Sequence, residues 1–111
     1  MPESPSHRIR KRKDAGGLGI TDYSLPSGRR LDAVSVTGIA TEIERGGPTQ
    51  IRKAVRRLKE SLNSGDARKV RLRVHQSNLD VAYEEMRRQR VGGELTNLGG
   101  TTKTHVPKRR K

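Results

Sequence analysis

The chain contains no Phe and no Trp, and only two Tyr among its 111 residues. Hydrophobic residues make up 29% of it, so any core has to be thin and built from aliphatic side chains. A chain of this length supports a single domain and little more. There is also no Cys, so neither a disulfide nor a thiolate zinc site can supplement such a core.

Positive charge dominates the polar residues. Lys and Arg number 25 against 12 acidic residues, which gives a formal net charge of +13. The excess lies mostly at the two ends, because residues 14–102 carry 15 basic and 11 acidic residues, a net of +4. A cation that neutralises a phosphate releases a bound counterion, so we expect tight, salt-sensitive binding to DNA or RNA. The alternative is that the tails only aid solubility or that residues 107–111 form a localisation signal.

Membrane association is not expected from this sequence. No apolar stretch approaches the roughly 18 residues that a membrane-spanning helix needs. The N-terminus lacks the apolar segment of a signal peptide, and the basic tails have no apolar face to insert into a bilayer. We therefore expect a cytoplasmic protein, and the sequence indicates no oligomeric state.

The chain divides into three regions by composition. Residues 1–19 and 99–111 are predicted to be a disordered basic arm and a basic tail. Residues 20–98 are predicted to form a mixed α/β domain with a small mixed β-sheet and the order β-β-β-α-β-α. Its first three strands are expected at residues 20–25, 29–36 and 39–45.

Two helices follow, each with an apolar stripe at helical spacing. The first begins near Pro48 or Thr49 and ends at residues 63–65; its stripe is Ile51, Val55, Leu58 and Leu62. A strand at 69–75 then alternates strictly, with Lys69, Arg71, Arg73 and His75 expected to face outward. The second helix is expected to begin with a capping box of Ser77 and Asp80 and to end at Gly92 and Gly93. Its stripe is Leu79, Ala82, Tyr83 and Met86, and a short last strand at 94–98 is doubtful.

Three carboxylates are expected to gather on the hairpin of the second and third strands. Glu42 and Glu44 are two residues apart, so they share one face of a strand. A three-residue loop at 36–38, with Gly38 in the left-handed conformation, would place Asp32 opposite Glu42. A two-residue loop would instead send Asp32 to the other face.

Adjacent carboxylates repel one another and also repel phosphate, and a divalent cation would resolve both problems. Mg²⁺ binds one or two carboxylates together with substrate phosphate and water, and it can activate a water molecule for hydrolysis. The alternative is that Asp32, Glu42 and Glu44 form a solvated face with salt bridges to neighbouring arginines.

The stretch from residue 25 to residue 62 resembles the core of the PD-(D/E)XK (restriction-endonuclease-like) nucleases, above all the toxin modules of bacterial polymorphic toxins. In that family a strand with Gly-Arg-Arg delivers an Asp, and a strand of pattern G-[IV]-A-x-E-x-K-x-G follows before a helix. The matching segments here are residues 28–34 (GRRLDAV) and 38–46 (GIATEIERG), followed by the helix with Gln50 and the strand at 70–74.

The resemblance implies an endonuclease with Mg²⁺ or Mn²⁺ as cofactor and Asp32, Glu42 and Glu44 as its catalytic and metal-binding residues. Glu44 stands where the family has a lysine, which normally helps to activate the attacking water. Some restriction endonucleases carry a second acid at this place, so activity is compatible with Glu44. Arg45 is a poor substitute for the lysine, because it is one residue away and points to the opposite face. A toxin of this kind would imply an immunity protein, expected to be acidic, and delivery into a target cell as part of a larger protein.

A set of basic or polar residues is expected to contact the nucleic acid. Arg29, Arg30 and Arg45 flank the acids, and the arginines of the first helix form a ridge for backbone contacts. The full set is Arg29, Arg30, Arg45, Gln50, Arg52, Arg56, Arg57, Arg71 and Arg73.

Three functions remain open from the sequence. The first is a metal-dependent endonuclease, and the second is a non-catalytic basic protein that binds DNA or RNA. The third is a metal-free ribonuclease that uses His75 as general acid or base.

Overall fold

The structure is a computed structural model that describes residues 5–16 and 19–108. In chain order it contains α1 (Pro5–Ala15), β1 (Ile20–Ser24), β2 (Arg30–Val34), β3 (Ile39–Glu44), α2 (Pro48–Ser64), β4 (Lys69–Val74), the 3-10 turn η1 (Gln76–Asn78), α3 (Leu79–Gln89), β5 (Gly93–Asn97) and β6 (Lys103–Val106). The mixed α/β class is confirmed, and the five expected strands lie within two residues of their predicted ends.

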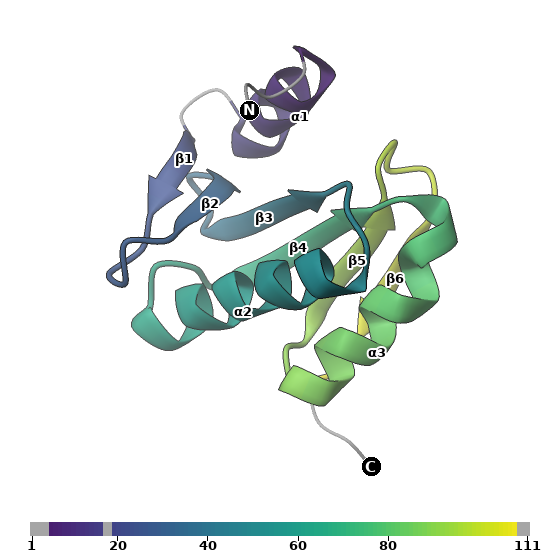
Figure 1. The fold of residues 1–111 in the computed structure, drawn as a ribbon. Helices are drawn as coiled ribbons and strands as arrows, with labels where there is room; N and C mark the ends of the chain where they lie inside the picture. The colour runs from purple at the N-terminus through teal and green to yellow at the C-terminus, as the bar shows by residue number, and fades with distance from the viewer. Residues whose placement is uncertain (1–4, 17–18, 109–111) are drawn as a thin grey trace.

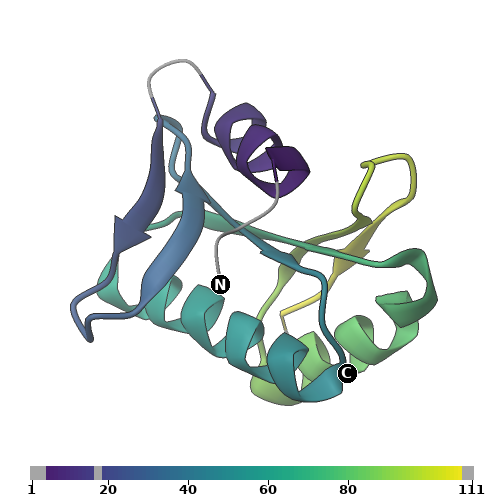
Figure 2. The ribbon, with the colours of Figure 1, turned by 45° about the horizontal axis from the view of Figure 1, so that its top comes forward.

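A single six-stranded sheet forms the middle layer, with its strands in the order of the chain. Strands β1, β2 and β3 form an antiparallel meander, β4 and β5 continue parallel to β3, and β6 returns antiparallel. Parallel neighbours need a crossover, and right-handed crossovers that advance in one direction place their helices on one face. Helices α2 and α3 accordingly cover one face of the sheet, and α1 lies on the other (Figures 1 and 2).

The core between the sheet and α2 is thin and aliphatic, as its composition predicts. The stripe of α2 is confirmed: Ile51, Val55 and Leu58 are fully buried, and Leu62 packs against the same core. The inward side chains of β4 face it, namely Val70, Leu72 and Val74. The helix ends as expected at Gly65, whose φ of 82° is favourable for glycine.

Helix α3 departs from the prediction at both ends. Its N-cap residue is Asn78, with no side-chain cap, and Ser77 lies in η1, so the predicted capping box is wrong. The helix ends at Gln89, before the two glycines. Gly92 and Gly93 serve close packing instead, since a Cβ atom there would lie 2.7 Å from the Lys108 nitrogen and 2.6 Å from the Val70 oxygen, respectively.

Both terminal regions contribute to the fold, which corrects two expectations. Part of the predicted disordered arm, residues 1–19, forms α1. Part of the predicted tail, residues 99–111, forms β6, which pairs with β5 and buries Val106. The rest of these predictions, for residues 1–4, 17–18 and 109–111, lies outside the described residues.

Strand β1 forms one edge of the sheet and contains a kink. Asp22 has a φ of 53°, and the paired positions on either side of it are Thr21 with Ala33 and Tyr23 with Leu31. The Asp22 carboxylate accepts a hydrogen bond of 2.6 Å from Lys11 of α1, whose side chain is almost fully buried. The kink therefore turns Asp22 toward the helix that covers this part of the sheet.

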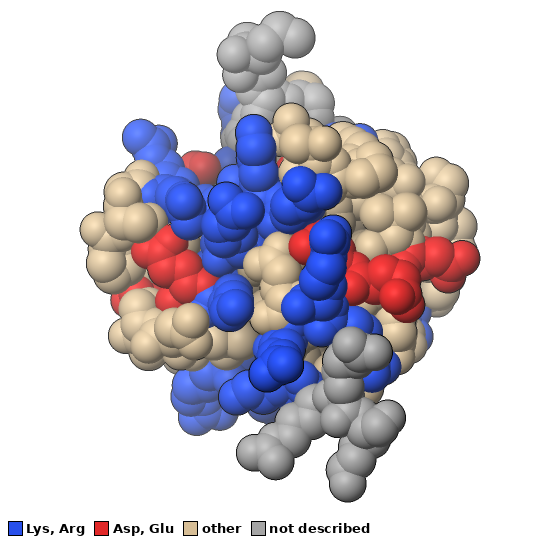
Figure 3. Space-filling view, turned by 60° about the horizontal axis from the view of Figure 1, so that its bottom comes forward, with Lys and Arg blue, Asp and Glu red and all other residues tan. Residues whose placement is uncertain are grey.

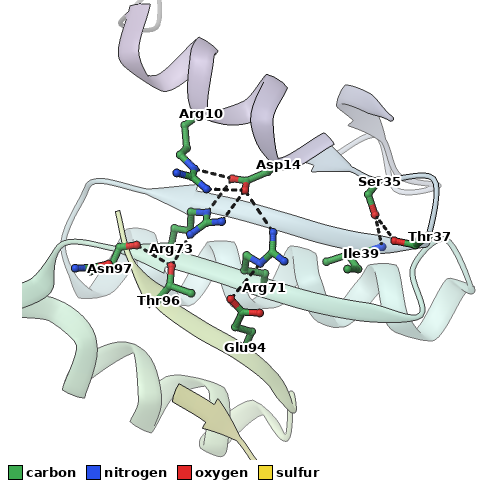
Figure 4. A network of polar contacts seen from close by, with 10 residues as sticks. All are labelled: Arg10, Asp14, Ser35, Thr37, Ile39, Arg71, Arg73, Glu94, Thr96 and Asn97. Atoms are coloured by element: carbon green, nitrogen blue, oxygen red, sulfur yellow. Dashed lines mark hydrogen bonds and ion pairs between the residues drawn. The ribbon is translucent and has the colours of Figure 1, made fainter. Parts of the chain in front are cut away.

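A buried ion pair fastens α1 to the sheet (Figure 4). Arg73 of β4 donates two hydrogen bonds, of 2.9 and 2.7 Å, to the Asp14 carboxylate, and Arg71 and Arg10 lie at 3.4 and 3.1 Å from it. Burial alone would raise the pKa of Asp14, but the hydrogen bonds and charges of Arg73 and Arg10 outweigh it and lower that pKa. Asp14 is therefore ionised and holds the buried Arg73 and the half-buried Arg71 and Arg10 in place.

We predict that Asp14→Asn lowers the free energy of unfolding by about 3–5 kcal/mol at neutral pH, because Arg73 then stays buried without its counter-charge. Urea denaturation followed by circular dichroism measures this loss. Because the pKa of Asp14 is lowered, the stabilisation is complete above the ordinary value of 3.8 and is lost on acidification, so the difference between the two proteins should shrink there. Asp80→Asn is the control, since Asp80 is exposed. Equal losses in both variants would contradict the role given to Asp14.

Candidate nucleic-acid interface and carboxylate cluster

The hairpin between β2 and β3 has the three-residue loop that the sequence predicts. The Ser35 nitrogen bonds to the Ile39 oxygen at 3.0 Å, and Gly38 has a φ of 86°. The Ser35 hydroxyl strengthens this turn, because it accepts a bond of 3.1 Å from the Ile39 nitrogen (Figure 4). Ala33 lies opposite Thr41, and the same register continued by one residue places Asp32 across from Glu42.

Beyond Ala33 and Thr41, carboxylates replace the backbone pairing of β2 and β3. The Asp32 nitrogen donates a bond of 3.0 Å to Glu42 Oε2. In return the Ile43 nitrogen donates a bond of 2.7 Å to Asp32 Oδ2. Each acid is therefore held by a backbone N–H group of the neighbouring strand, which fixes both side chains at the point where the strands diverge.

Arg57 of α2 supplies the cation that compensates these acids. Its Nε donates a hydrogen bond to Glu42 Oε1, and the Glu42 side chain is only 2% exposed. Burial lowers the pKa of Arg57, but the charges of Glu42, Asp32 and Glu44 together raise it. Arg57 therefore contacts Glu42, and the charges of Asp32 and Glu44 act on the same guanidinium group.

The environment of Glu42 disfavours its charged form. Burial, and next the charge of Asp32, raise the pKa of Glu42 well above its usual value, although Arg57 opposes this shift. A proton on Glu42 therefore relieves repulsion within the cluster even though Arg57 is adjacent.

Glu44 turns toward the loop that leads into α2. Its Oε2 accepts a bond of 2.8 Å from the Gly46 nitrogen. A Cβ atom at Gly46 would lie 2.9 Å from this oxygen and 2.9 Å from Gln50 Cγ, so a side chain there would have to displace both groups. Gln50 itself is exposed in the first turn of α2.

The cluster as folded does not fit a divalent cation. Arg57 and a backbone N–H group already engage the two oxygens of Glu42, and the Ile43 nitrogen engages one oxygen of Asp32. Within residues 5–16 and 19–108, no group of three or more His, Asp or Glu side chains could hold a metal ion. The Mg²⁺ or Mn²⁺ expected from the sequence stays a prediction.

Helix α1 brings a further residue to the carboxylate cluster, and this residue lies in the predicted disordered arm. His7 Nε2 lies 3.5 Å from Asp32 Oδ1. His75, the candidate for metal-free catalysis, is exposed after the end of β4. The sequence carried no signal for the approach of His7, because it depends on how α1 packs on the sheet.

The helical face of the domain carries a concentration of cations (Figure 3). We call these residues the basic band: Arg52, Lys53, Arg56 and Lys59 of α2 with Arg87, Arg88 and Arg90 at the end of α3. The two parts are in contact, because the Gln89 side chain donates a bond of 3.1 Å to the Arg52 oxygen. All are exposed except Arg87, which is half-buried.

The predicted contact residues divide between this face and other places. Arg52 and Arg56 belong to the basic band, whereas Arg57 points inward to Glu42. Its neighbours at i−3 and i+4, Ala54 and Ser61, are both buried, and this is the signal in the sequence that could have placed it.

The remaining predicted arginines lie outside the basic band. Arg30 and Arg45 are exposed, and Arg29 lies 3.6 Å from Glu60 at the turn after β1. The outward orientation expected for Arg71 and Arg73 is wrong, because α1 covers that face of the sheet. Arg73 is 4% exposed and Arg71 is half-buried.

Comparisons with protein families, curated proteins and solved structures found no match to this chain. Among the described helices, none is long and apolar enough to cross a membrane.

We predict that Glu42→Gln removes a pH-dependent loss of stability. The folded state holds a proton on Glu42 above the ordinary pKa, so the free energy of unfolding falls as pH rises through the raised value. An amide at this position stays neutral, so the free energy of unfolding of the variant should rise relative to that of the wild type as pH increases. Urea denaturation at a series of pH values from acidic to mildly alkaline tests this. Parallel curves for the two proteins would contradict it.

Proposed function

We propose that this domain binds nucleic acid through the phosphate backbone, with the basic band as its contact surface. The observation that carries the proposal is a set of exposed cations on one face that have no counter-charge. Among the described residues, the side chains of Lys53, Arg56, Lys59 and Arg90 make no hydrogen bond or ion pair with another residue. These charges are therefore available to a polyanion.

The geometry of α2 suits a run of phosphates. Arg52, Arg56 and Lys59 follow one line along the helix, at positions i, i+4 and i+7, and this line is about 10 Å long. Phosphates recur every 3.4 Å along one strand of a duplex axis, so several fall within this length. Two tyrosines and no other large aromatic residue supply no stacking platform for bases. Binding is therefore expected to be independent of base sequence and sensitive to salt.

We also infer a fold of the restriction-endonuclease-like type. Its support is the order of the strands β2 and β3, the helix α2 and the strand β4, which is the order that the resemblance implies. The glutamate at position 44 remains the main departure from that family's pattern.

We predict that the double variant Arg56→Gln/Lys59→Gln weakens binding to both duplex and single-stranded oligonucleotides. Loss of two phosphate contacts should lower the slope of log K against log salt by about 1.8 for a duplex. Fluorescence anisotropy at 50–200 mM salt measures both quantities.

The matched control for that experiment is Lys69→Gln/Lys103→Gln. It removes the same charge from the opposite face of the sheet. Lys69 lies two residues before Arg71 and therefore shares its face of β4. Lys103 pairs with Thr96, which in turn pairs with Arg73, so it lies on that face too. The control should keep most of the affinity. If it weakens binding as much as the double variant of α2, the basic band is not the contact surface.

Metal-dependent cleavage of the bound nucleic acid is a second candidate function. The observation that favours it is the register of β2 and β3, which places Asp32 across from Glu42 as expected. The charge of Glu44 also acts on Arg57, the partner of Glu42. A role as a bacterial toxin or defence module, with an acidic immunity partner, would follow from this candidate. The occupation of the cluster by Arg57 favours the binding function instead.

We predict that Asp32→Ala binds nucleic acid as the wild type does, and that Mg²⁺ or Mn²⁺ changes binding only by screening. Incubation of plasmid DNA and RNA with each protein, with either metal or with EDTA, separates the candidates. Cleavage that needs the metal and is lost in Asp32→Ala would establish the second candidate. Cleavage that survives EDTA would instead point to His75, with His75→Ala as its control.

A further inference from the structure

A hollow at the end of α3 is lined by three arginines that are not among the contact residues predicted from the sequence. Its volume is about 420 Å³, and its lining residues are Glu84, Arg87, Arg88 and Arg90. Three cations and one acid therefore line a partly open hollow at the end of the basic band.

Arg87 is held in place but keeps an unused donor. Its guanidinium carbon lies 6.0 Å from the centre of the Tyr83 ring, and its Nη1 lies 3.5 Å from the Tyr83 hydroxyl. Its Nε is buried and has no hydrogen-bond partner. A buried donor without a partner is costly. Because this nitrogen is shielded from solvent, an acceptor in the hollow reaches it only when the Arg87 side chain shifts.

Arg90 occupies a position that glycine would fill with less strain. Its φ of 61° lies in the left-handed region, where residues other than glycine are disfavoured. The backbone already closes the helix, because the Arg90 nitrogen bonds to the Arg87 oxygen and the Val91 nitrogen bonds to the Met86 oxygen. The Arg90 side chain is thus not needed as a cap and makes no bond to another described residue.

The adjacent acid on α3, Glu85, pairs with Arg88 and leaves Arg87 and Arg90 uncompensated. Glu85 is buried and accepts bonds from Arg88 and Gln89, and it lies 3.9 Å from Arg52. Glu84 is the one carboxylate among the residues that line the hollow. The hollow therefore keeps a net positive charge, and guanidinium groups offer the paired donors that a phosphate accepts.

We propose that the hollow of Arg87, Arg88 and Arg90 binds one phosphate group of the strand that lies along the basic band. This inference rests on the proposed function and adds an anchoring site at one end of the contact surface. It assigns Arg90 a binding role that accounts for an arginine in a left-handed conformation.

Arg90→Gly tests this inference without a general loss of stability. Glycine relieves the backbone strain, so the melting temperature should stay equal or rise, whereas affinity for a labelled 12-nucleotide single strand should fall about tenfold. The salt slope should fall by about 0.7, the value for one contact to a single strand. The Nε resonance of Arg87 should shift when the oligonucleotide is added to the wild type, since a phosphate in the hollow changes the surroundings of this guanidinium group.

Lys103→Gln is the charge-matched control from the opposite face, and it should bind almost as the wild type does. If Arg90→Gly binds like this control, or if the Arg87 resonance does not move, the anchoring site is wrong while the proposed function stands. If the wild type binds no nucleic acid at all, both the proposed function and the anchoring site fail.

Discussion

The buried pair of Asp14 and Arg73 determines how the N-terminal part of this domain is arranged. Helix α1 is rich in cations and contributes little apolar surface, with Ala15 as its buried apolar residue. A single carboxylate near its end draws it onto a strand whose outward side chains are arginines. The contacts of Lys11 with Asp22 and of His7 with Asp32 depend on the helix being there. Ion pairs thus hold this helix on the sheet, whereas large apolar side chains do so in most domains of this size.

The opposite face of the sheet repeats this solution with Glu42 and Arg57. Both pairs join a helix to a central strand. The basic residues of the chain therefore fall into two groups. Arg57, Arg71 and Arg73 are used within the fold, and the cations of α2 and α3 remain at the surface for a partner.

Features that depend on neighbouring residues were predictable from the sequence. The left-handed Gly38 determined the loop and hence the approach of Asp32 to Glu42, and the spacing of Ile51, Val55 and Leu58 determined the buried side of α2. The pairing of Asp14 with Arg73 joins residues that are 59 positions apart, so no local pattern announces it. The packing of α1 on the sheet and the covering of Arg71 and Arg73 therefore cannot be predicted from local patterns. Sequence reasoning assigns Arg57 to the exposed ridge of α2, whereas its place at the border of the apolar stripe turns it toward Glu42.

The kink at Asp22 has a consequence for how this domain behaves at high concentration. An open sheet leaves unpaired N–H and C=O groups along its outer strands, and these groups can recruit strands of other molecules. A left-handed residue in the middle of β1 breaks the regular alternation of such groups, and its carboxylate turns toward Lys11. We therefore expect β1 to be a poor template for intermolecular β-pairing and for aggregation.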